Sequence, residues 1–232
     1  MSGEMTGKVV MITGATGGLG SGVVQRFREA GASLALVARS AEEASALVSG
    51  AFGVGADVTD PASVQAAVDQ IAAHYGRIDA LVHTVGGYAS SKTTDVDLAV
   101  WDKMMNLNAR SVLVTAGTVA NFMLKQQMSG SIVVVLARNA LDGTKNHAAY
   151  SASKAAAQRI LQSLSKELID QGIRVNGVIP GTIDTPANRE STPNADFSRW
   201  VTPAQIAEVI LFLTSEASSP INGDSLTVYG RS

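Results

Sequence analysis

The sequence predicts an α/β fold, a single-domain doubly wound parallel sheet with helices on both faces. Three observations support this prediction. Short β-branched and apolar runs alternate with longer helical stretches, as in parallel strands joined by crossover helices. The first run leads directly into a glycine-rich turn. No linker, internal repeat or low-complexity tract divides the chain, so we expect one domain over residues 1–232.

Most of the apolar runs read as buried strands. Strand candidates lie near residues 8–13, 33–38, 79–84, 131–136, 173–178 and 225–229, with a weaker one near 53–56. Asp60-Pro61 predicts a helix start, because Asp caps free backbone N–H groups and Pro suits the first helical turn. Helical stretches follow most strands, notably at 98–127 and 150–171. Trp101, Met104 and Met105 are core candidates of the first stretch.

The composition restricts the class of protein. With 46% hydrophobic residues, the chain can bury one substantial core. The net charge of −2 gives no basic surface for nucleic acid, and no apolar run is long enough for a membrane span. Cysteine is absent, and no His, Asp or Glu cluster has metal-ligand spacing. We therefore expect a cytoplasmic protein with a small-molecule partner and no metal, nucleic acid or membrane partner.

A nucleotide-binding turn is predicted between the first strand and the helical stretch that follows it. The segment reads Thr13-Gly-Ala-Thr-Gly-Gly-Leu-Gly20. Glycines there permit a tight turn and let backbone N–H groups approach a pyrophosphate at the helix N-terminus. The spacing, Gly-x-x-x-Gly-x-Gly, differs from the standard Gly-x-Gly-x-x-Gly fingerprint. An ordinary glycine-rich turn is the alternative.

Tyr150 and Lys154 form a second motif. Residues four apart lie on one face of a helix, so the ammonium can lie beside the phenol. A neighbouring positive charge favours phenolate, and is expected to lower the Tyr150 pKa from its usual value of ~10. Tyr150 would then act as a general acid that protonates a substrate as hydride arrives. A chance pair on a helix is the alternative for this motif taken alone.

Together the two motifs resemble the short-chain dehydrogenase/reductase family, over nearly the whole chain. The resemblance implies a nicotinamide-dependent oxidoreductase in which Tyr150 supplies a proton and Lys154 lowers its pKa and holds the nicotinamide ribose. It also implies that Asn108 bends a central helix and anchors a proton-relay water. One element departs from the family: His83-Thr-Val-Gly-Gly87 replaces the usual Asn-Asn-Ala-Gly after the fourth strand.

The resemblance also implies the cofactor contacts. Asp57 matches the acid that holds the adenine amine, and Pro180, Gly181 and Thr185 match the segment that contacts the nicotinamide. The expected cofactor-binding residues are Gly14, Thr16, Gly18, Leu19, Gly20, Arg39, Ser40, Asp57, Val58, Gly86, Tyr150, Lys154, Pro180, Gly181, Ile183 and Thr185.

Ala38 and Arg39 bear on which nicotinamide is used. An acid at the position of Ala38 would bind the NAD ribose and repel a 2′-phosphate. Arg39 can instead pair with that phosphate and stack on adenine. An exposed strand-end Arg is the alternative, and Gly17 stands where NADP-preferring members often carry a second basic residue. We expect NADP(H) to be favoured, with NAD(H) as the alternative.

Ala137 occupies the position of an expected serine. In most of the family, a Ser thirteen residues before the Tyr hydrogen-bonds the substrate carbonyl, and losing such a donor costs a few kcal/mol. Asn139 could donate from a different angle. Either the chain is a non-catalytic NADP-binding regulatory protein, or its substrate accepts hydride without that bond. Retention of Tyr150, Lys154 and Asn108 favours the second interpretation.

The segments around Ala137 resemble the dihydropteridine reductase branch of the family. That branch also has Ala there, keeps the Tyr and Lys, and places Gly-Gly-aromatic after the fourth strand, as in Gly86-Gly87-Tyr88. Its substrate is a quinonoid dihydropterin, which needs protonation more than carbonyl polarisation. The resemblance implies a reductase of a quinonoid dihydropterin-like or other planar conjugated acceptor. A general carbonyl reductase, acting on a ketone or 3-oxoacyl thioester, is the alternative.

The expected substrate contacts are Tyr88, Ala137, Asn139, His147 and Asn188. Tyr88 could stack on a planar substrate or pack on its own neighbours. Arg189 could neutralise an anionic substrate or lie exposed on a lid. The family resemblance further implies a homodimer or homotetramer, formed through the helices at 98–127 and 150–171.

Overall fold

The computed structural model describes residues 3–95 and 97–231, which contain one parallel sheet. Its strands are β1 (Val9–Thr13), β2 (Ser33–Ala38), β3 (Phe52–Gly55), β4 (Ala80–His83), β5 (Gly130–Val135), β6 (Ile173–Pro180) and β7 (Ser225–Val228). The order β3-β2-β1-β4-β5-β6-β7 runs outward in both directions from the β1–β4 pair. The predicted doubly wound sheet is confirmed, and each predicted strand lies within two residues of its expected bounds.

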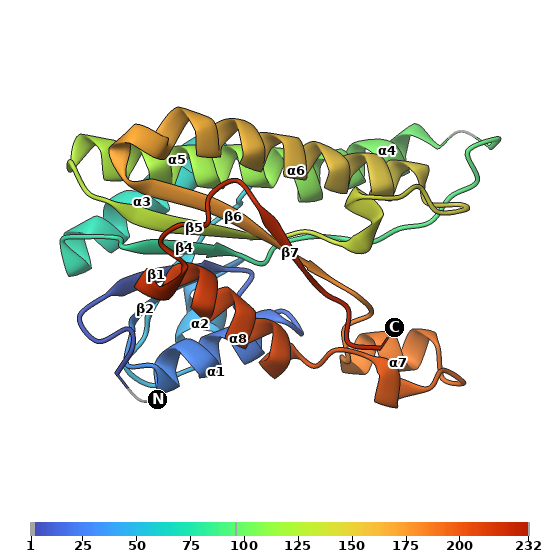
Figure 1. The fold of residues 1–232 in the computed structure, drawn as a ribbon, viewed down its shortest axis with the longest axis horizontal. Coiled ribbons are helices and arrows are strands. Elements are labelled where there is room, and N and C mark those ends of the chain that lie inside the picture. Colours follow the sequence, from blue (N-terminus) through green and yellow to red (C-terminus); the bar gives the residue numbers. More distant parts are fainter. Residues whose placement is uncertain (1–2, 96, 232) are drawn as a thin grey trace.

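Helices cover both faces of the sheet (Figure 1). They are α1 (Gly20–Glu29), α2 (Ala41–Ser45), α3 (Pro61–Tyr75), α4 (Leu98–Met104), the π-helical turn η1 (Met105–Arg110), α5 (Ser111–Lys125), α6 (Ala148–Leu168), α7 (Pro186–Ser191) and α8 (Pro203–Thr214). Short 3-10 turns are η2 (Arg138–Ala140), η3 (Ile169–Gln171), η4 (Phe197–Arg199) and η5 (Glu216–Ser218). The helices α3, α5 and α6 cover one face, and α1 and α8 cover the other.

The central strands are buried on both sides. Successive residues of a strand point to opposite faces, so Val9 and Met11 of β1 join the core under α3, α5 and α6. Val10 and Ile12 join the second core, under α1 and α8. This double burial explains why the strands appear in the sequence as nearly continuous apolar runs.

The helix predicted at 98–127 is divided by the π-helical turn η1. Such turns are rare and often occur at functional sites. The Ser111 hydroxyl donates to the Leu107 carbonyl at 2.6 Å, and so satisfies a backbone acceptor of the turn. The prediction that Trp101 lies in the core is wrong. Its side chain is 41% exposed, because α4 extends past the edge of the sheet and buries only Met104 fully.

The start of α3 follows the predicted capping chemistry. The Asp60 carboxylate accepts hydrogen bonds from the backbone N–H groups of Ala62 and Ser63, and Pro61 occupies the first turn. The boundaries of α6 differ slightly from the prediction. It begins at Ala148, two residues early, and the last three predicted residues form the 3-10 turn η3.

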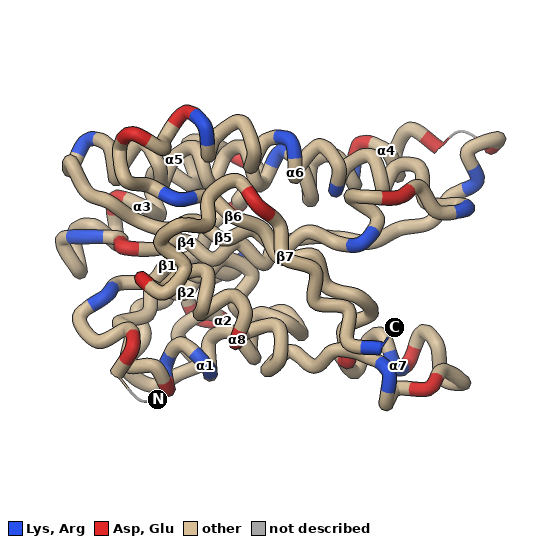
Figure 2. The backbone as a smooth tube through the Cα atoms, viewed as in Figure 1, with Lys and Arg blue, Asp and Glu red and all other residues tan. Residues whose placement is uncertain are grey.

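Charged side chains of both signs are interspersed along the helices and loops (Figure 2). Over the described residues, no helix is long and apolar enough to cross a membrane. Within that same part of the chain, no group of three or more His, Cys, Asp or Glu side chains could hold a metal ion.

Candidate active site

Two adjoining cavities open at the carboxyl ends of the strands. They lie at the β1–β4 pair, where the strand order changes direction: β2 and β3 follow β1 toward one edge of the sheet, and β5 to β7 follow β4 toward the other. The nucleotide cavity, of about 600 Å³, is lined by Gly14, Thr16, Gly17, Val37, Ala38, Arg39, Ala56, Asp57, Val58, Thr59, Thr84, Val85, Gly86 and Leu107. The catalytic cavity, of about 480 Å³, is lined by Leu19, Thr84, Gly86, Gly87, Tyr88, Val135, Leu136, Ala137, Arg138, Asn139, Tyr150, Lys154, Pro180, Gly181, Thr182, Ile183 and Asn188. Ligands of open α/β sheets bind at this position.

The glycine-rich turn is shaped by close backbone approaches. Gly14 has a φ of 71°, and a Cβ there would lie 2.7 Å from the Thr84 hydroxyl. A Cβ on Gly18 would lie 2.9 Å from the side chain of Thr185, and one on Gly20 would overlap the Gly14 carbonyl. Side chains at these positions would fill the cradle at the start of α1. The turn therefore fits the diphosphate of a dinucleotide, whose oxygens accept from backbone N–H groups.

Arg39 and Asp57 line the nucleotide cavity as predicted. Arg39 is exposed at the end of β2. The Asp57 carboxylate accepts two hydrogen bonds from Thr59, through its hydroxyl and its N–H, and these hold the Asp57 pKa below its usual value. The Ser40 hydroxyl instead caps α2 by accepting from the Glu43 N–H. Ser40 does not line the cavity, so its cofactor role stays a prediction.

Tyr150 and Lys154 project from the first turns of α6 into the catalytic cavity. The Lys154 ammonium is buried and donates to the Val135 carbonyl at 3.1 Å, and burial lowers its pKa to about 8. Burial, assisted by Tyr88, raises the pKa of Tyr150 to about 12. The predicted lowering of the Tyr150 pKa is therefore wrong. The ammonium is bonded to the Val135 carbonyl, and burial of the phenol disfavours its charged form.

Asn108 lies in η1 and binds the loop that follows β4. Its side-chain oxygen accepts from the Gly87 N–H at 2.9 Å, and its amide nitrogen donates to the Gly87 carbonyl at 3.0 Å. The same nitrogen donates to the Ser153 hydroxyl of α6. A Cβ on Gly86 would lie 3.0 Å from Asn108 Oδ1 and 3.1 Å from Lys154 Nζ. The loop, η1 and α6 thus meet at one crowded point behind the cavity.

Ala137 lines the catalytic cavity at the end of β5 and presents no hydrogen-bonding side chain there. Asn139 also lines the cavity, but both hydrogens of its amide are engaged. One is donated to the Thr144 hydroxyl at 3.0 Å and the other to the Ser151 hydroxyl at 3.3 Å. Asn139 therefore cannot donate to a substrate carbonyl without breaking its bond to Thr144 or to Ser151 of α6.

His83 is a buried hydrogen-bonding residue. Its Nδ1 lies 2.9 Å from the Thr13 hydroxyl, and its Nε2 lies 3.2 Å from the Ser111 hydroxyl. Since the Ser111 hydroxyl donates to the Leu107 carbonyl, Nε2 carries the proton and Nδ1 accepts from Thr13. Burial, with Lys154 nearby, lowers the His83 pKa to about 3. The neutral ring ties β1 to the first residue of α5 rather than acting as a base.

The segment after β6 forms the outer wall of the catalytic cavity. Thr185 caps α7 by accepting from the Asn188 N–H, and the Asn188 side chain donates to the Ile183 carbonyl while lining the cavity. Arg189 is paired with Asp184 through two hydrogen bonds and lies over the Phe197 ring. Arg189 is thus occupied within the segment itself.

The structure brings most of the predicted site residues together. Gly18, Gly20, Ser40, Asn108, His147 and Thr185 lie around the cavities without lining them. The lining residues that sequence reasoning missed include Thr84, Gly87, Leu107, Arg138 and Thr182. Position was the available signal, because several of them directly follow a predicted strand end, where ligands of parallel sheets bind.

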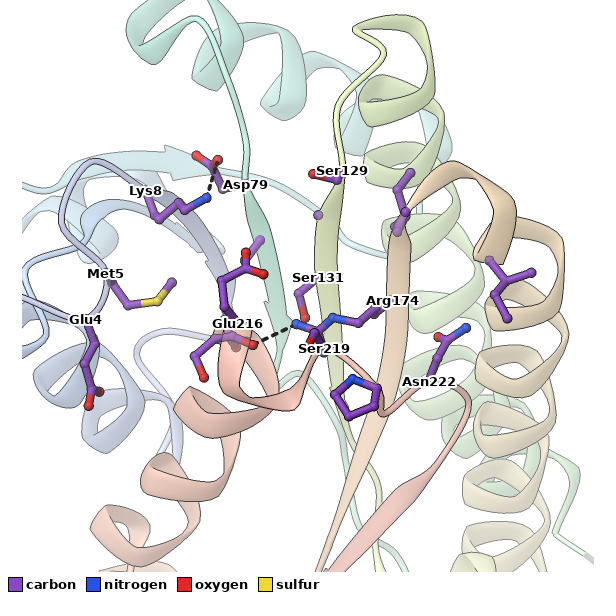
Figure 3. Close-up of a pocket in the computed structure, with 18 residues that line it drawn as sticks. Glu4, Met5, Lys8, Asp79, Ser129, Ser131, Arg174, Glu216, Ser219 and Asn222 are labelled. Carbon is purple, nitrogen blue, oxygen red and sulfur yellow. Dashed lines mark hydrogen bonds and ion pairs between the residues drawn. The ribbon is translucent and has the colours of Figure 1, made fainter.

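A third cavity, of about 370 Å³, lies near the amino ends of β1, β5 and β6 (Figure 3). Its charged groups are used structurally. Asp79 accepts from the Val9 N–H and pairs with Arg77 and Lys8. Arg174 donates to backbone carbonyls at the end of α8 and beyond it. These contacts hold the ends of the elements together.

The chain belongs to the short-chain dehydrogenase family, whose model matches residues 8–196. An uncharacterised oxidoreductase of Staphylococcus epidermidis is 32% identical, covering 95% of this chain and 96% of that protein. The 3-oxoacyl-[acyl-carrier-protein] reductase of Thermotoga maritima is 32% identical, covering 98% of each. The chain is therefore an oxidoreductase.

Solved structures agree with this assignment. A short-chain type dehydrogenase/reductase from Mycobacterium ulcerans has a TM-score of 0.91 and 26% identity, covering 100% of this chain and 90% of the other. ElxO with NADP bound has a TM-score of 0.89 and 26% identity, covering 96% and 97%. Enzymes of this family use NAD(P)H, and the predicted nicotinamide cofactor is confirmed at this level.

Proposed function

We propose that this oxidoreductase is an NADPH-preferring reductase of planar conjugated acceptors, with a quinonoid dihydropterin as the model substrate. One observation carries the proposal. The catalytic cavity contains a phenol that can donate a proton, while Ala137 leaves no hydroxyl to polarise a carbonyl. A quinonoid π-system is activated already, so it needs a proton more than a polarising donor.

Each residue of the site has a separate role in the proposed reaction. When bound, a reduced nicotinamide supplies the hydride. Tyr150 holds its proton firmly, with a pKa of about 12, and releases it only to an acceptor that gains basicity during reduction. Lys154, buried at the wall of the catalytic cavity, would hold the nicotinamide ribose. Asn108 fixes the loop that forms the cavity wall through its two bonds to Gly87, and would anchor the proton-relay water that the family resemblance implies.

The cofactor preference rests on Arg39. It is exposed at the rim of the nucleotide cavity, and Ala38 provides no acid to repel a 2′-phosphate. The dihydropteridine reductase branch is supported by the same residues as before, Ala137 with Gly86-Gly87-Tyr88.

Assembly and location are part of the proposal. We expect a cytoplasmic homodimer or homotetramer formed through α4, α5 and α6. Trp101 of α4 and Leu113 of α5 are exposed apolar side chains on these helices, at 41% and 58%.

The test is NADPH oxidation against a quinonoid dihydropterin, a quinone and a simple ketone, with Tyr150→Phe as the inactive control. The proposal expects turnover of the first two and little of the ketone. Good ketone turnover without quinonoid turnover would overturn it. NADPH binding without turnover of any acceptor would favour a regulatory protein.

A general carbonyl reductase is the second candidate. The 32% identity to a 3-oxoacyl-[acyl-carrier-protein] reductase favours it. Its chemistry would require Tyr150 alone to stabilise the developing alkoxide, because Ala137 cannot donate and Asn139 is engaged by Thr144 and Ser151.

A further inference from the structure

Arg138 contributes a guanidinium to the catalytic cavity that the reaction chemistry does not use. It directly follows Ala137, opens the short turn η2, and is exposed at the cavity wall. Its position, next to the residue that usually polarises the substrate, places a cation where a substituent of the substrate would lie.

The guanidinium is held without using its donors. Its central carbon lies 5.3 Å from the centroid of the Tyr229 ring, at the end of β7. A cation–π contact uses the face of the guanidinium and leaves its five N–H groups for other partners. Among the described residues, no carboxylate lies within ion-pair distance of Arg138, although Asp142 follows closely in the same loop. Arg189, by contrast, has both sets of donors on Asp184.

The charge of the cavity lining is one-sided. Its titratable groups are the cations Lys154 and Arg138 and the phenols Tyr88 and Tyr150, and no Asp or Glu is among its described lining residues. Lys154 is buried and bonded to the Val135 carbonyl, whereas Arg138 is exposed. An anion entering the cavity would therefore meet Arg138 and no repelling carboxylate.

We propose that Arg138 is the receptor for an oxyanion carried by the substrate, and that the substrate is a planar conjugated compound with a carboxylate or similar group. The fork of N–H donors matches a carboxylate in two parallel hydrogen bonds. This inference adds a substituent to the substrate of the proposed function, and it rests on that function for the nature of the reacting ring. Anion binding by Arg138 can be measured without turnover.

Equilibrium binding tests the receptor directly. Naphthoate and naphthamide share one ring system and differ in charge, and each is titrated by calorimetry into the NADP⁺-saturated protein. Wild-type protein should bind naphthoate at least about tenfold more tightly, since hydrogen bonds to charged groups are worth roughly 1.5–3 kcal/mol. Arg138→Gln should reduce this preference to about twofold or less. Lys145→Gln removes an exposed cation of the neighbouring loop that does not line the cavity, and should keep the preference.

Equal affinity for the two ligands, no measurable naphthoate binding, or an undiminished preference in Arg138→Gln would each overturn the receptor. Turnover distinguishes this failure from failure of the proposed function. The ratio of kcat/KM for naphthoquinone sulfonate over naphthoquinone should fall about tenfold in Arg138→Gln. Quinone reduction with an unchanged ratio would overturn the anion-binding role of Arg138 but not the proposed reductase activity. Anion binding through Arg138 without reduction of any acceptor would overturn the proposed reductase activity but not the anion-binding role.

Discussion

The Tyr88 hydroxyl lies 2.5 Å from Nε2 of His147, and this bond links a lining residue of the catalytic cavity to the residue that precedes α6. Nδ1 of His147 lies 2.6 Å from the Lys145 carbonyl, so Nδ1 carries a proton and Nε2 accepts from Tyr88. A bridge between Ser91 and His147 holds the same two loops together. The Tyr88 ring meets the Tyr150 ring edge-on, with centroids 5.2 Å apart. Tyr88 is thereby oriented over the proton donor.

Removing the Tyr88 hydroxyl should loosen the wall that Tyr88 forms in the catalytic cavity. Tyr88→Phe keeps the ring but loses the bond to His147, and we expect KM for a quinonoid acceptor to rise about fivefold, as for one hydrogen bond of roughly 1 kcal/mol. Tyr88→Ala should raise it further, because the ring is lost. Steady-state kinetics with His147→Gln and the double variant measure the coupling. Strictly additive effects of the two single changes would show that the bond does not position Tyr88.

Tyr150→Phe should lower kcat by about 10²–10⁴-fold, as for loss of a general acid. The affinity for NADPH, measured by fluorescence titration, should stay within about twofold, because the cofactor contacts of the turn and of Arg39 are untouched. Retention of most of the activity would mean that another group delivers the proton, with His147 the nearest candidate through Tyr88.

Arg39→Ala should weaken NADPH binding about tenfold or more and leave NADH nearly unchanged, because a guanidinium–phosphate bond is worth roughly 1.5–3 kcal/mol. Arg28→Ala is the matched control, since Arg28 is an exposed cation of α1 that does not line the nucleotide cavity. Equal losses for both cofactors would show that Arg39 does not read the 2′-phosphate.

Much of the fold could be predicted because its signals are local. The Asp60-Pro61 cap, the glycine turn and the apolar runs depend on neighbouring residues, and each lies where expected. Trp101 failed because apolar spacing identifies a helix but does not show whether it lies on the sheet or past its edge.

The sequence predicted which residues form the site better than it predicted their pKa values. The four-residue spacing predicts that Tyr150 and Lys154 share one face of α6. It does not predict how deeply the two side chains are buried, or which acceptor the Lys154 ammonium binds. Val135, nineteen residues away, provides that acceptor. Burial lowers the pKa of Lys154, for which the sequence made no prediction, and raises that of Tyr150, against the prediction. The role of Arg138 depends on Tyr229, from the far end of the chain, and no local pattern connects the two.

The buried Lys154 should make stability depend on pH. Its pKa falls from 10.5 to about 8 on folding, so between these values the unfolded chain binds more protons than the folded one. Stability therefore rises with pH across this window, and below it the folded state bears the full cost of a buried ammonium. Tyr150, whose pKa is raised, lowers stability only above about pH 10, where unfolded tyrosine ionises.

Lys154→Met keeps the apolar stem and removes the charge. The unfolding free energy of this variant minus that of wild type is measured by urea titrations between about pH 7 and pH 10. We expect this difference to be highest near pH 7 and to fall by about 2–3 kcal/mol by pH 10. Loss of the bond to the Val135 carbonyl shifts the whole difference by a constant and leaves this slope intact. Lys125→Met, at an exposed position of α5, should show no such slope. A difference for Lys154→Met that is flat with pH would mean that the ammonium is not desolvated by folding.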